Sequence, residues 1–277
     1  MPFTASGTLV GYDPGGNDKH GLALLTLRDG QPTDLRTQTC ASAEAVIRAV
    51  EACDDVVGLG LDTMTCWSTG KSGYRPADRW IREQYPDILN SVVSPNGMYG
   101  SMGINGMSVA LWAADHYDAL YITETHPKAL YHAVSGERYD YASSSDAMHA
   151  LLASHLEVEV ASVTNDHEWD AALSTLAVLR GLDGAWSRDL HALDASDDET
   201  LIEPAGPTRY VQPKSTSLRQ AGHEMSGAQE SAVRLVGVVP NQSTAHFSHV
   251  RRSLRRNRMF WTYHEPSHRR SHRISLC

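Results

Sequence analysis

The chain has 277 residues, of which 41% are hydrophobic, and a formal net charge of −9. This length allows one large domain or two small ones and is sufficient for a hydrophobic core. No apolar run approaches the roughly 18 residues that cross a bilayer, and the first residues lack the charged and apolar regions of a signal peptide. We therefore expect a soluble, cytoplasmic protein without a membrane partner. The four cysteines form neither a CxxC pair nor a zinc spacing, which argues against a structural zinc site.

The charge is divided unevenly along the chain. Residues 1–213 contain 13 Lys and Arg against 30 Asp and Glu, a net charge of −17, whereas residues 214–277 contain 11 against 3, a net charge of +8. We interpret 1–213 as one domain and 214–277 as a basic, poorly ordered C-terminal tail. Aromatic residues among the tail arginines could stack on bases while the arginines contact phosphates. A solvated basic tail, or a reading-frame shift near Pro213, would explain the same composition, and the abrupt change favours these readings.

Three strands are predicted at the start of the chain. The apolar segment 7–13 ends at Asp13 and runs into a Pro-Gly-Gly turn, which predicts a strand and a tight connection. Segments 21–29 and 34–40 are predicted as the second and third strands, because the Asp29-Gly30 pair between them is typical of a hairpin. A carboxylate at the end of a buried strand is costly unless a cation or hydrogen-bond donor meets it. Asp13 therefore needs a partner.

A helix and a fourth strand follow. In residues 41–53 apolar side chains recur with helical spacing behind a possible cap at Ser42. Segment 55–62 is a short apolar run of the kind buried on both faces of a sheet, and it ends at Asp62. Because a helix serves as the crossover, this strand is expected to lie parallel to an earlier one.

Residues 63–107 are rich in Gly, Ser, Asn and Pro and are interpreted as an irregular insertion with one short helix over 75–85. Beyond it, the pattern predicts a helix over 105–117. The strand predicted over 119–127 is again close to an acid, Glu124.

Three helices are predicted in the remainder of the domain. The helix over 127–136 begins with proline and stops at glycine, and the helix over 144–159 is expected to be capped by a serine. The helix over 164–184 has the clearest pattern, with Asn165 and Glu168 spaced as a capping box. Its expected buried stripe consists of Trp169, Ala172, Leu173, Leu176 and Ala177.

The strand-end acids indicate a metal site. Asp13, Asp62 and Glu124 would meet at one edge of the sheet, where ligands bind in parallel sheets. The last helix could bring Asp170 alongside, with Asp166 one turn before it. Carboxylates this close repel one another and require divalent cations, and oxygen ligands suit Mg²⁺ or Mn²⁺. Two such ions about 4 Å apart would serve phosphoryl chemistry.

Four motifs resemble, in their order along the chain, a family of predicted nucleases of unknown function with the RNase H-like fold. These motifs are GYDPGG, GLGLDT, TETHPKAL and DHEWDAALSTLAVLRG. The resemblance covers about residues 7–210. It implies an α/β fold with a mixed five-stranded sheet, three antiparallel strands followed by two parallel ones, flanked by helices. The implied activity is metal-dependent cleavage of phosphodiester bonds by a two-ion mechanism, with a nucleic acid as partner.

The resemblance also implies roles for individual residues. Asp13, Asp62 and Asp170 match the family's metal carboxylates, and Glu124 matches the acid of its Glu-x-His-Pro motif, which gives four candidate catalytic acids. The pair Thr63-Met64 departs from the family, which has a small residue and proline after the second acid.

Five basic residues are candidates for substrate binding. Arg75, Arg79 and Arg82 share one helical face with spacing suited to phosphate contacts, and they also resemble an arginine-rich element of the family; a solvated face is the alternative. His126 could shape the turn before its helix, cap it or bind substrate. His167 could act as a base, contact phosphate or be a surface residue. With Asp170 it forms the H-x-x-D spacing seen in RuvC-type resolvases, which have the same fold.

Two other functions remain open from the sequence. An actin-like ATPase or phosphotransferase also has Asp followed by a glycine-rich hairpin, but it needs two copies of the fold, and one acidic set is present here. A non-catalytic nucleic-acid or protein-binding module on the same fold is the other alternative. The net charge of −17 on residues 1–213 argues against tight binding of a nucleic acid regardless of its sequence, because contacts with phosphates supply most of the affinity in such binding.

Overall fold

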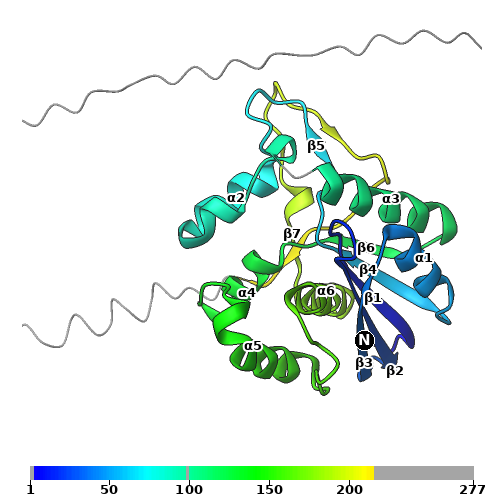
Figure 1. Cartoon of the computed structure of the whole chain (residues 1–277). Helices are drawn as coiled ribbons and strands as arrows, with labels where there is room; N and C mark the ends of the chain where they lie inside the picture. The colour runs from blue at the N-terminus through cyan, green and yellow to red at the C-terminus, as the bar shows by residue number, and fades with distance from the viewer. Residues whose placement is uncertain (1–2, 98–99, 215–277) are drawn as a thin grey trace, which may run out of the picture. The chain divides into compact units, whose positions relative to one another are not determined.

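A mixed sheet forms the centre of the protein. The computed structural model describes residues 3–97 and 100–214, all within the first of two units, Met1–Leu218 (Figure 1). The sheet has five strands in the order β3-β2-β1-β4-β6. The first three pair antiparallel, and β1, β4 and β6 pair parallel. This confirms the expected α/β fold with a mixed five-stranded sheet, three antiparallel strands followed by two parallel ones. The strands are β1 (Gly7–Asp13), β2 (His20–Arg28), β3 (Gln31–Cys40), β4 (Val56–Leu61) and β6 (Tyr121–Glu124).

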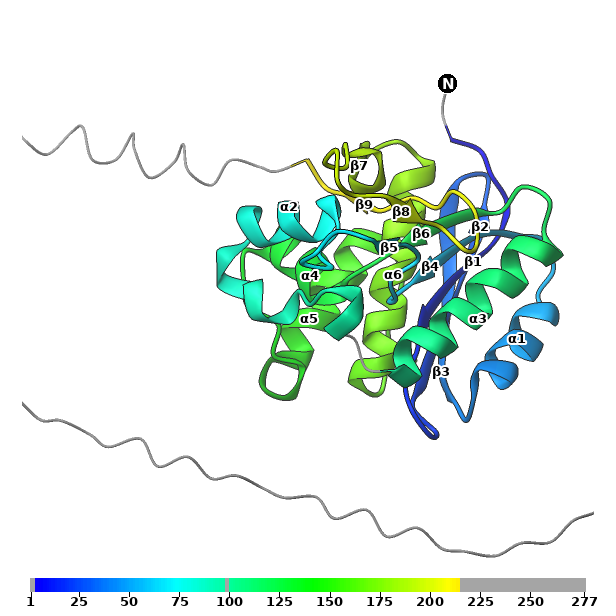
Figure 2. The same ribbon diagram turned by 90° about the horizontal axis from the view of Figure 1, so that it is seen from above.

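Helices cover both faces of this sheet. Figure 2 shows α1 and α3 on one side and α6 on the other. The core is divided in the same way, because alternate strand residues point to opposite faces. Leu9 packs with α6, whereas Val10 packs with α1 and α3. The helices are α1 (Ala43–Glu51), α2 (Pro76–Gln84), α3 (Gly100–His116), α4 (Pro127–Ser135), α5 (Tyr141–Leu156) and α6 (Asp166–Leu182).

The helix starts agree with the sequence in part. The side chain of Ser42 caps α1 and that of Asn165 caps α6, as predicted. In a capping box the side chain of Glu168 would also accept a hydrogen bond from the backbone N–H of Asn165. This part of the prediction is wrong, because Glu168 instead accepts hydrogen bonds from the backbone N–H and the hydroxyl of Thr164. The serine cap predicted for the helix over 144–159 is not formed, because α5 begins earlier, at Tyr141, and is capped by the side chain of Asp140; the backbone of Ser144 within it is not helical. An acid before a serine run offered two plausible caps.

The insertion 63–107 is more regular than expected. It contains β5 (Trp67–Ser68), the predicted short helix α2, and two 3₁₀ turns at Pro86–Ser91 and Pro95–Gly97. After α6 the chain returns to the edge of the sheet, where the backbone of Arg209 bonds to that of Ile122 and Glu124. The short elements of this return are β7 (Arg188–Asp189), a 3₁₀ turn at Leu190–Ala192, β8 (Leu201–Ile202) and β9 (Val211–Gln212).

The boundary near residue 213 stays a prediction, and residues 215–277 of the expected tail lie outside the described residues. In the described ranges, no helix combines the length and apolarity that crossing a membrane requires.

Helix α6 approaches the sheet very closely because glycines face it. A Cβ atom at Gly11 of β1 would overlap the backbone carbonyl of Ala171, and one at Gly21 of β2 would overlap that of His167. Both contacts involve backbone atoms of α6, so a rotamer change could not relieve them. These glycines therefore set the distance between α6 and the ends of the strands.

Replacing Gly11 with alanine is expected to displace α6 and to lower the unfolding free energy by about 1–3 kcal/mol. Gly16→Ala is the matched control, because a Cβ there meets nothing within 4 Å. Urea denaturation of both variants measures the difference. Equal stability of the two variants would contradict the close packing of α6.

Candidate metal centre

Two of the strand-end acids point to the same face because of the strand register. Tyr12 of β1 pairs with Leu61 of β4, and the N–H of Asp62 donates to the carbonyl oxygen of Tyr12 at 2.9 Å. Asp13 and Asp62 each follow by one residue. Since Tyr12 and Leu61 both face α1 and α3, the two aspartates face α6.

Helix α6 completes a group of three carboxylates. Asp13, Asp62 and Asp170 each offer one oxygen, and these oxygens all lie within 4.8 Å of one another. Asp13 is 4% exposed, and Oδ1 of Asp170 is buried without a hydrogen-bond partner among the described residues. The structure thus brings together the three predicted metal ligands, which we call the aspartate triad.

The triad is electrostatically unfavourable without a cation. Burial raises the pKa of Asp13, and hydrogen bonding to His167 offsets this only in part. Burial and the charge of Asp13 raise the pKa of Asp62 well above its ordinary value. Burial and the charges of Asp13 and Asp62 do the same for Asp170. An all-oxygen donor set with an unpartnered buried oxygen fits Mg²⁺ or Mn²⁺.

His167 supports one member of the triad. Its Nδ1 lies 2.7 Å from Oδ2 of Asp13, and its side chain is 31% exposed. Hydrogen bonding to Asp13 raises the pKa of His167, against burial, so the imidazole donates to the carboxylate. Asp13 is thereby fixed in orientation while its other oxygen remains available.

The N-terminal part of α6, which carries His167 and Asp170, is held by an aromatic cluster. Trp169 is fully buried, and the rings of Tyr131 and Tyr139 meet it edge-on at 5.6 Å. Such T-shaped contacts add to the stability gained from burial. The buried hydroxyl of Tyr139 lies near Asp170, and burial and the charge of that carboxylate raise the pKa of Tyr139.

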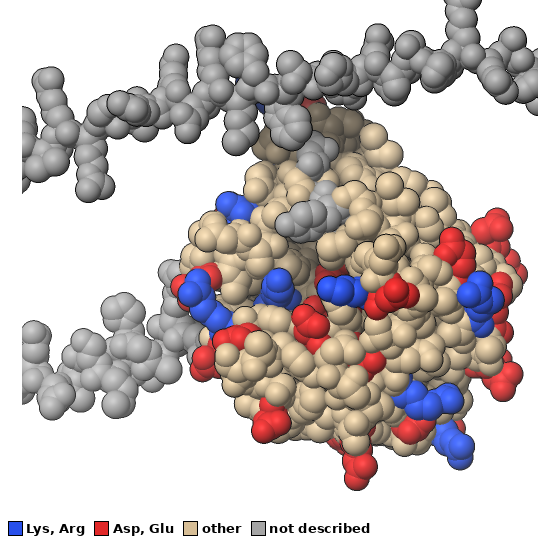
Figure 3. Space-filling view, viewed as in Figure 1, with Lys and Arg blue, Asp and Glu red and all other residues tan. Residues whose placement is uncertain are grey.

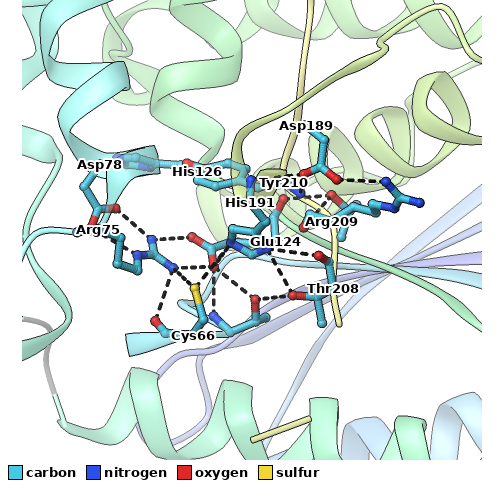
Figure 4. Close-up of polar contacts among 12 residues, drawn as sticks. Cys66, Arg75, Asp78, Glu124, His126, Asp189, His191, Thr208, Arg209 and Tyr210 are labelled. Atoms are coloured by element: carbon cyan, nitrogen blue, oxygen red, sulfur yellow. Dashed lines mark hydrogen bonds and ion pairs between the residues drawn. The ribbon is translucent and has the colours of Figure 1, made fainter. Parts of the chain in front are cut away.

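Glu124 lies apart from the triad. It pairs with Leu61, one residue earlier in register than Asp62, and therefore points to the opposite face of the sheet. Arg75 donates hydrogen bonds to both of its oxygens, at 2.6 and 2.7 Å (Figure 4). Oε2 also accepts a hydrogen bond from the backbone N–H of Thr65 at 2.8 Å. The residue that follows β6 as Asp62 follows β4 is Thr125, whose hydroxyl forms a hydrogen bond with that of Ser174 of α6.

Arg75, expected to bind phosphate, is the centre of a buried ion network. It is 1% exposed and pairs with Asp78 as well as with Glu124. Burial raises the pKa of Glu124, but the charge of Arg75 and hydrogen bonds outweigh it and lower that pKa well below the usual range. The network fixes the loop after Asp62 through Thr65.

His191 adds a second cation to this network. Its Nε2 lies 3.4 Å from Oε2 of Glu124, and its Nδ1 lies 3.1 Å from the carbonyl oxygen of Thr208. Burial lowers the pKa of His191, but hydrogen bonds with Cys66 and Glu124 and the charge of Glu124 raise it to about 10. The imidazolium is thus the form present at neutral pH.

This raised pKa predicts a pH dependence of stability. Because the pKa is about 10 in the folded protein and about 6.5 when unfolded, the stabilisation is complete below pH 6.5 and is lost as the pH rises toward 10. We expect the unfolding free energy of the wild type to fall by a few kcal/mol more than that of His191→Gln over this range. Urea denaturation of both proteins at pH 6 and 9.5 measures this difference. An equal loss of unfolding free energy in the wild type and in His191→Gln would contradict the ion pair.

The remaining substrate-binding candidates contact the protein itself. Arg79, whose side chain is 40% exposed, pairs with Glu199 at 2.7 Å, and Arg82 donates to two backbone carbonyls. His126 precedes α4 without capping it; its ring nitrogen lies 3.1 Å from the carbonyl oxygen of Ser91. Burial and the charge of Lys128 lower the pKa of His126 to about 4, so it is neutral. Substrate contacts by these residues stay predictions.

A cavity of about 420 Å³ opens onto the triad. His126 and His167 lie in its wall. So does Lys128, which the sequence analysis did not single out because one lysine in the first turn of a helix has no distinguishing pattern. The other lining residues that matter below are Met64, Val92, Val93, Met102 and Tyr139.

Comparison with known proteins gives a distant likeness in structure. No family model and no curated protein matches the chain. Solved structures that match include Thermus thermophilus RuvC, with a TM-score of 0.35, and T. thermophilus RuvC in complex with a Holliday junction substrate, with a TM-score of 0.33. Each is 12% identical and covers 64% of this chain and 96% of its own. At this level of likeness nothing about the activity of this chain follows.

Proposed function

We propose that the protein is a metal-dependent nuclease that hydrolyses phosphodiester bonds at the aspartate triad. The observation that supports this most is the convergence of three carboxylates, from two adjacent strands and the helix facing them, with oxygens within 4.8 Å. Burial raises the pKa of all three carboxyl groups, and this environment supports a role for a bound divalent cation.

Asp13, Asp62 and Asp170 would hold Mg²⁺ or Mn²⁺. Two such ions, the number we propose, would supply water activation and stabilisation of the leaving oxygen in an in-line displacement. The protein contributes the fixed carboxylates, with Asp13 oriented by His167. In the reaction a water oxygen bonds to phosphorus and the P–O ester bond breaks. The proton lost by the water is balanced by one taken up by the leaving oxygen, which gives a phosphomonoester and a hydroxyl group.

Glu124 and Arg75 have a supporting role in this proposal. Both residues line the same cavity as the triad, but they are bound to each other, and Glu124 also holds Thr65, three residues after Asp62. We therefore propose that Glu124 and Arg75 position the loop that follows Asp62. This role replaces the catalytic role expected for Glu124 and the phosphate contact expected for Arg75.

Labelled DNA, RNA and hybrid substrates, assayed with Mg²⁺ or Mn²⁺, test the proposal. We expect cleavage that needs the metal, is lost with EDTA and is lost in Asp62→Asn. Asp115→Asn, an exposed acid of α3, is the matched control and should cleave normally. Cleavage that persists in Asp62→Asn would rule the triad out. Nucleotide-stimulated phosphate release without strand cleavage would support the actin-like alternative instead.

A further inference from the structure

The cavity beside the triad has two chemically different sides. One side carries the three aspartates, and the other carries aliphatic and thioether side chains from the insertion and from α3. Its volume of about 420 Å³ lies in the range of roughly 300–1,000 Å³ that is typical of pockets enclosing a small ligand. With divalent cations held by the aspartates, as proposed above, the cavity would suit a molecule with an anionic end and an apolar end.

Lys128 provides a cation at the anionic end. It is exposed, lines the cavity, and makes no ion pair within 4.0 Å among the described residues. Its Nζ lies 5.7 Å from the ring centre of Tyr139, which directs the ammonium group over that ring. Asp13, Asp62 and Asp170 line the same cavity as Lys128.

The apolar side is formed mainly by the segment after the first 3₁₀ turn. Val92 is buried, whereas Val93 is 37% exposed and is one of few large apolar side chains with that much exposure among the described residues. Both line the cavity together with Met64 and Met102. An exposed apolar side chain in the same cavity as the carboxylates provides a surface for a flat apolar group of a ligand.

Few cations are available for a long polyanion. Of the described residues that line the cavity, Arg75 and Lys128 carry a permanent positive charge, and Arg75 is fully used in its ion network. On the face drawn in Figure 3, Lys and Arg side chains are interspersed with Asp and Glu and form no continuous basic patch among the described residues. Tight duplex binding usually needs several phosphate contacts at once.

We propose that this cavity binds a single nucleotide unit, with its phosphate between the triad and Lys128 and its base against Val93. The proposal rests on the proposed function and narrows its substrate to nucleoside phosphoesters of about one unit, such as a strand end or a short oligonucleotide. Lys128 then contacts the phosphate and Val93 contributes to selecting the base.

Calorimetric titration of the full chain with deoxyadenosine monophosphate and with inorganic phosphate, both with Ca²⁺ present, tests this. We expect the nucleotide to bind more tightly than phosphate. Lys128→Met should weaken binding of both by roughly tenfold, as for a lost charge-assisted hydrogen bond. Val93→Ser should weaken binding of the nucleotide by roughly fivefold and leave binding of inorganic phosphate unchanged.

Each variant has a matched control. Lys71→Met removes an exposed lysine and Ile104→Ser an exposed apolar side chain, 69% exposed, neither of which lines the cavity. The proposal would be overturned if Lys128→Met and Val93→Ser changed the binding affinities no more than their controls do. It would also be overturned if inorganic phosphate bound as tightly as the nucleotide. Nucleotide binding with the expected pattern but without cleavage of any substrate would refute the proposed hydrolysis and leave this binding site standing.

Discussion

Replacing Arg75 with methionine is expected to lower the unfolding free energy by about 3–5 kcal/mol. The side chain is 1% exposed and makes ion pairs with Asp78 and Glu124 at 2.7 and 2.6 Å. Its removal leaves Asp78 buried without a cation and Glu124 with only the more distant His191, so much of the desolvation cost of both carboxylates is then uncompensated. Urea denaturation monitored by tryptophan fluorescence measures the loss.

Two further variants identify the cause. Arg36→Met removes an exposed arginine, 67% exposed, that pairs with Asp34, and it should cost less than about 1 kcal/mol. Adding Glu124→Gln to Arg75→Met should restore part of the stability, because it removes one of the two buried carboxylates that have lost Arg75. If Arg75 were instead held available for substrate, Arg75→Met would fold as stably as Arg36→Met and would lose only substrate affinity.

Replacing Asp170 with asparagine is expected to have opposite effects on the two forms of the protein. Without metal the variant should be more stable than the wild type by about 1–2 kcal/mol, because burial and two neighbouring charges already disfavour the Asp170 carboxylate. With Mn²⁺ the order should reverse, because the wild type alone gains stability from binding. The proposed nuclease activity should fall on the order of 10³-fold.

Thermal unfolding with and without Mn²⁺ measures both effects. Because the pKa values of the triad are raised, protons compete with the metal, and the stabilisation of the wild type by Mn²⁺ should grow as the pH rises. Asp146→Asn, an exposed acid of α5, is the control and should respond to Mn²⁺ as the wild type does. A Mn²⁺ response in Asp170→Asn equal to that of the wild type would contradict its assignment as a ligand.

Much of the sheet could be predicted from local patterns. The apolar run before Asp13, the Asp29-Gly30 hairpin and the crossover helix after Ser42 each have a direct physical cause in the sequence. The two-residue strands β5, β7, β8 and β9 could not be predicted in this way, because so short a segment has no periodicity and forms only when its distant partner is in place.

The prediction of the acidic site depended on register. A strand-end acid can be recognised from the sequence, but a shift of one residue turns its side chain to the other face. Asp62 follows the residue paired with Tyr12, whereas Glu124 is itself paired with Leu61, and this single step separates a triad member from a buried ion pair. Pairing between β4 and β6 is a tertiary contact that the sequence of either strand alone does not specify.

The cationic residues show the same dependence on tertiary structure. Arg75, Arg79 and Arg82 have helical spacing that suits phosphate, yet their carboxylate and carbonyl partners come from distant or irregular segments. Lys128 faces the cavity because the turn at Pro127 starts α4 beside the triad. Partners far apart in the chain decided which charges remained available.

The most direct test is the position of Mn²⁺ in crystals of the full chain grown or soaked with MnCl₂. Anomalous scattering should show an ion with carboxylate oxygens of Asp13, Asp62 and Asp170 at about 2.0–2.4 Å, absent from crystals of Asp170→Asn. Manganese bound only elsewhere, with the three carboxylates uncoordinated, would contradict the account.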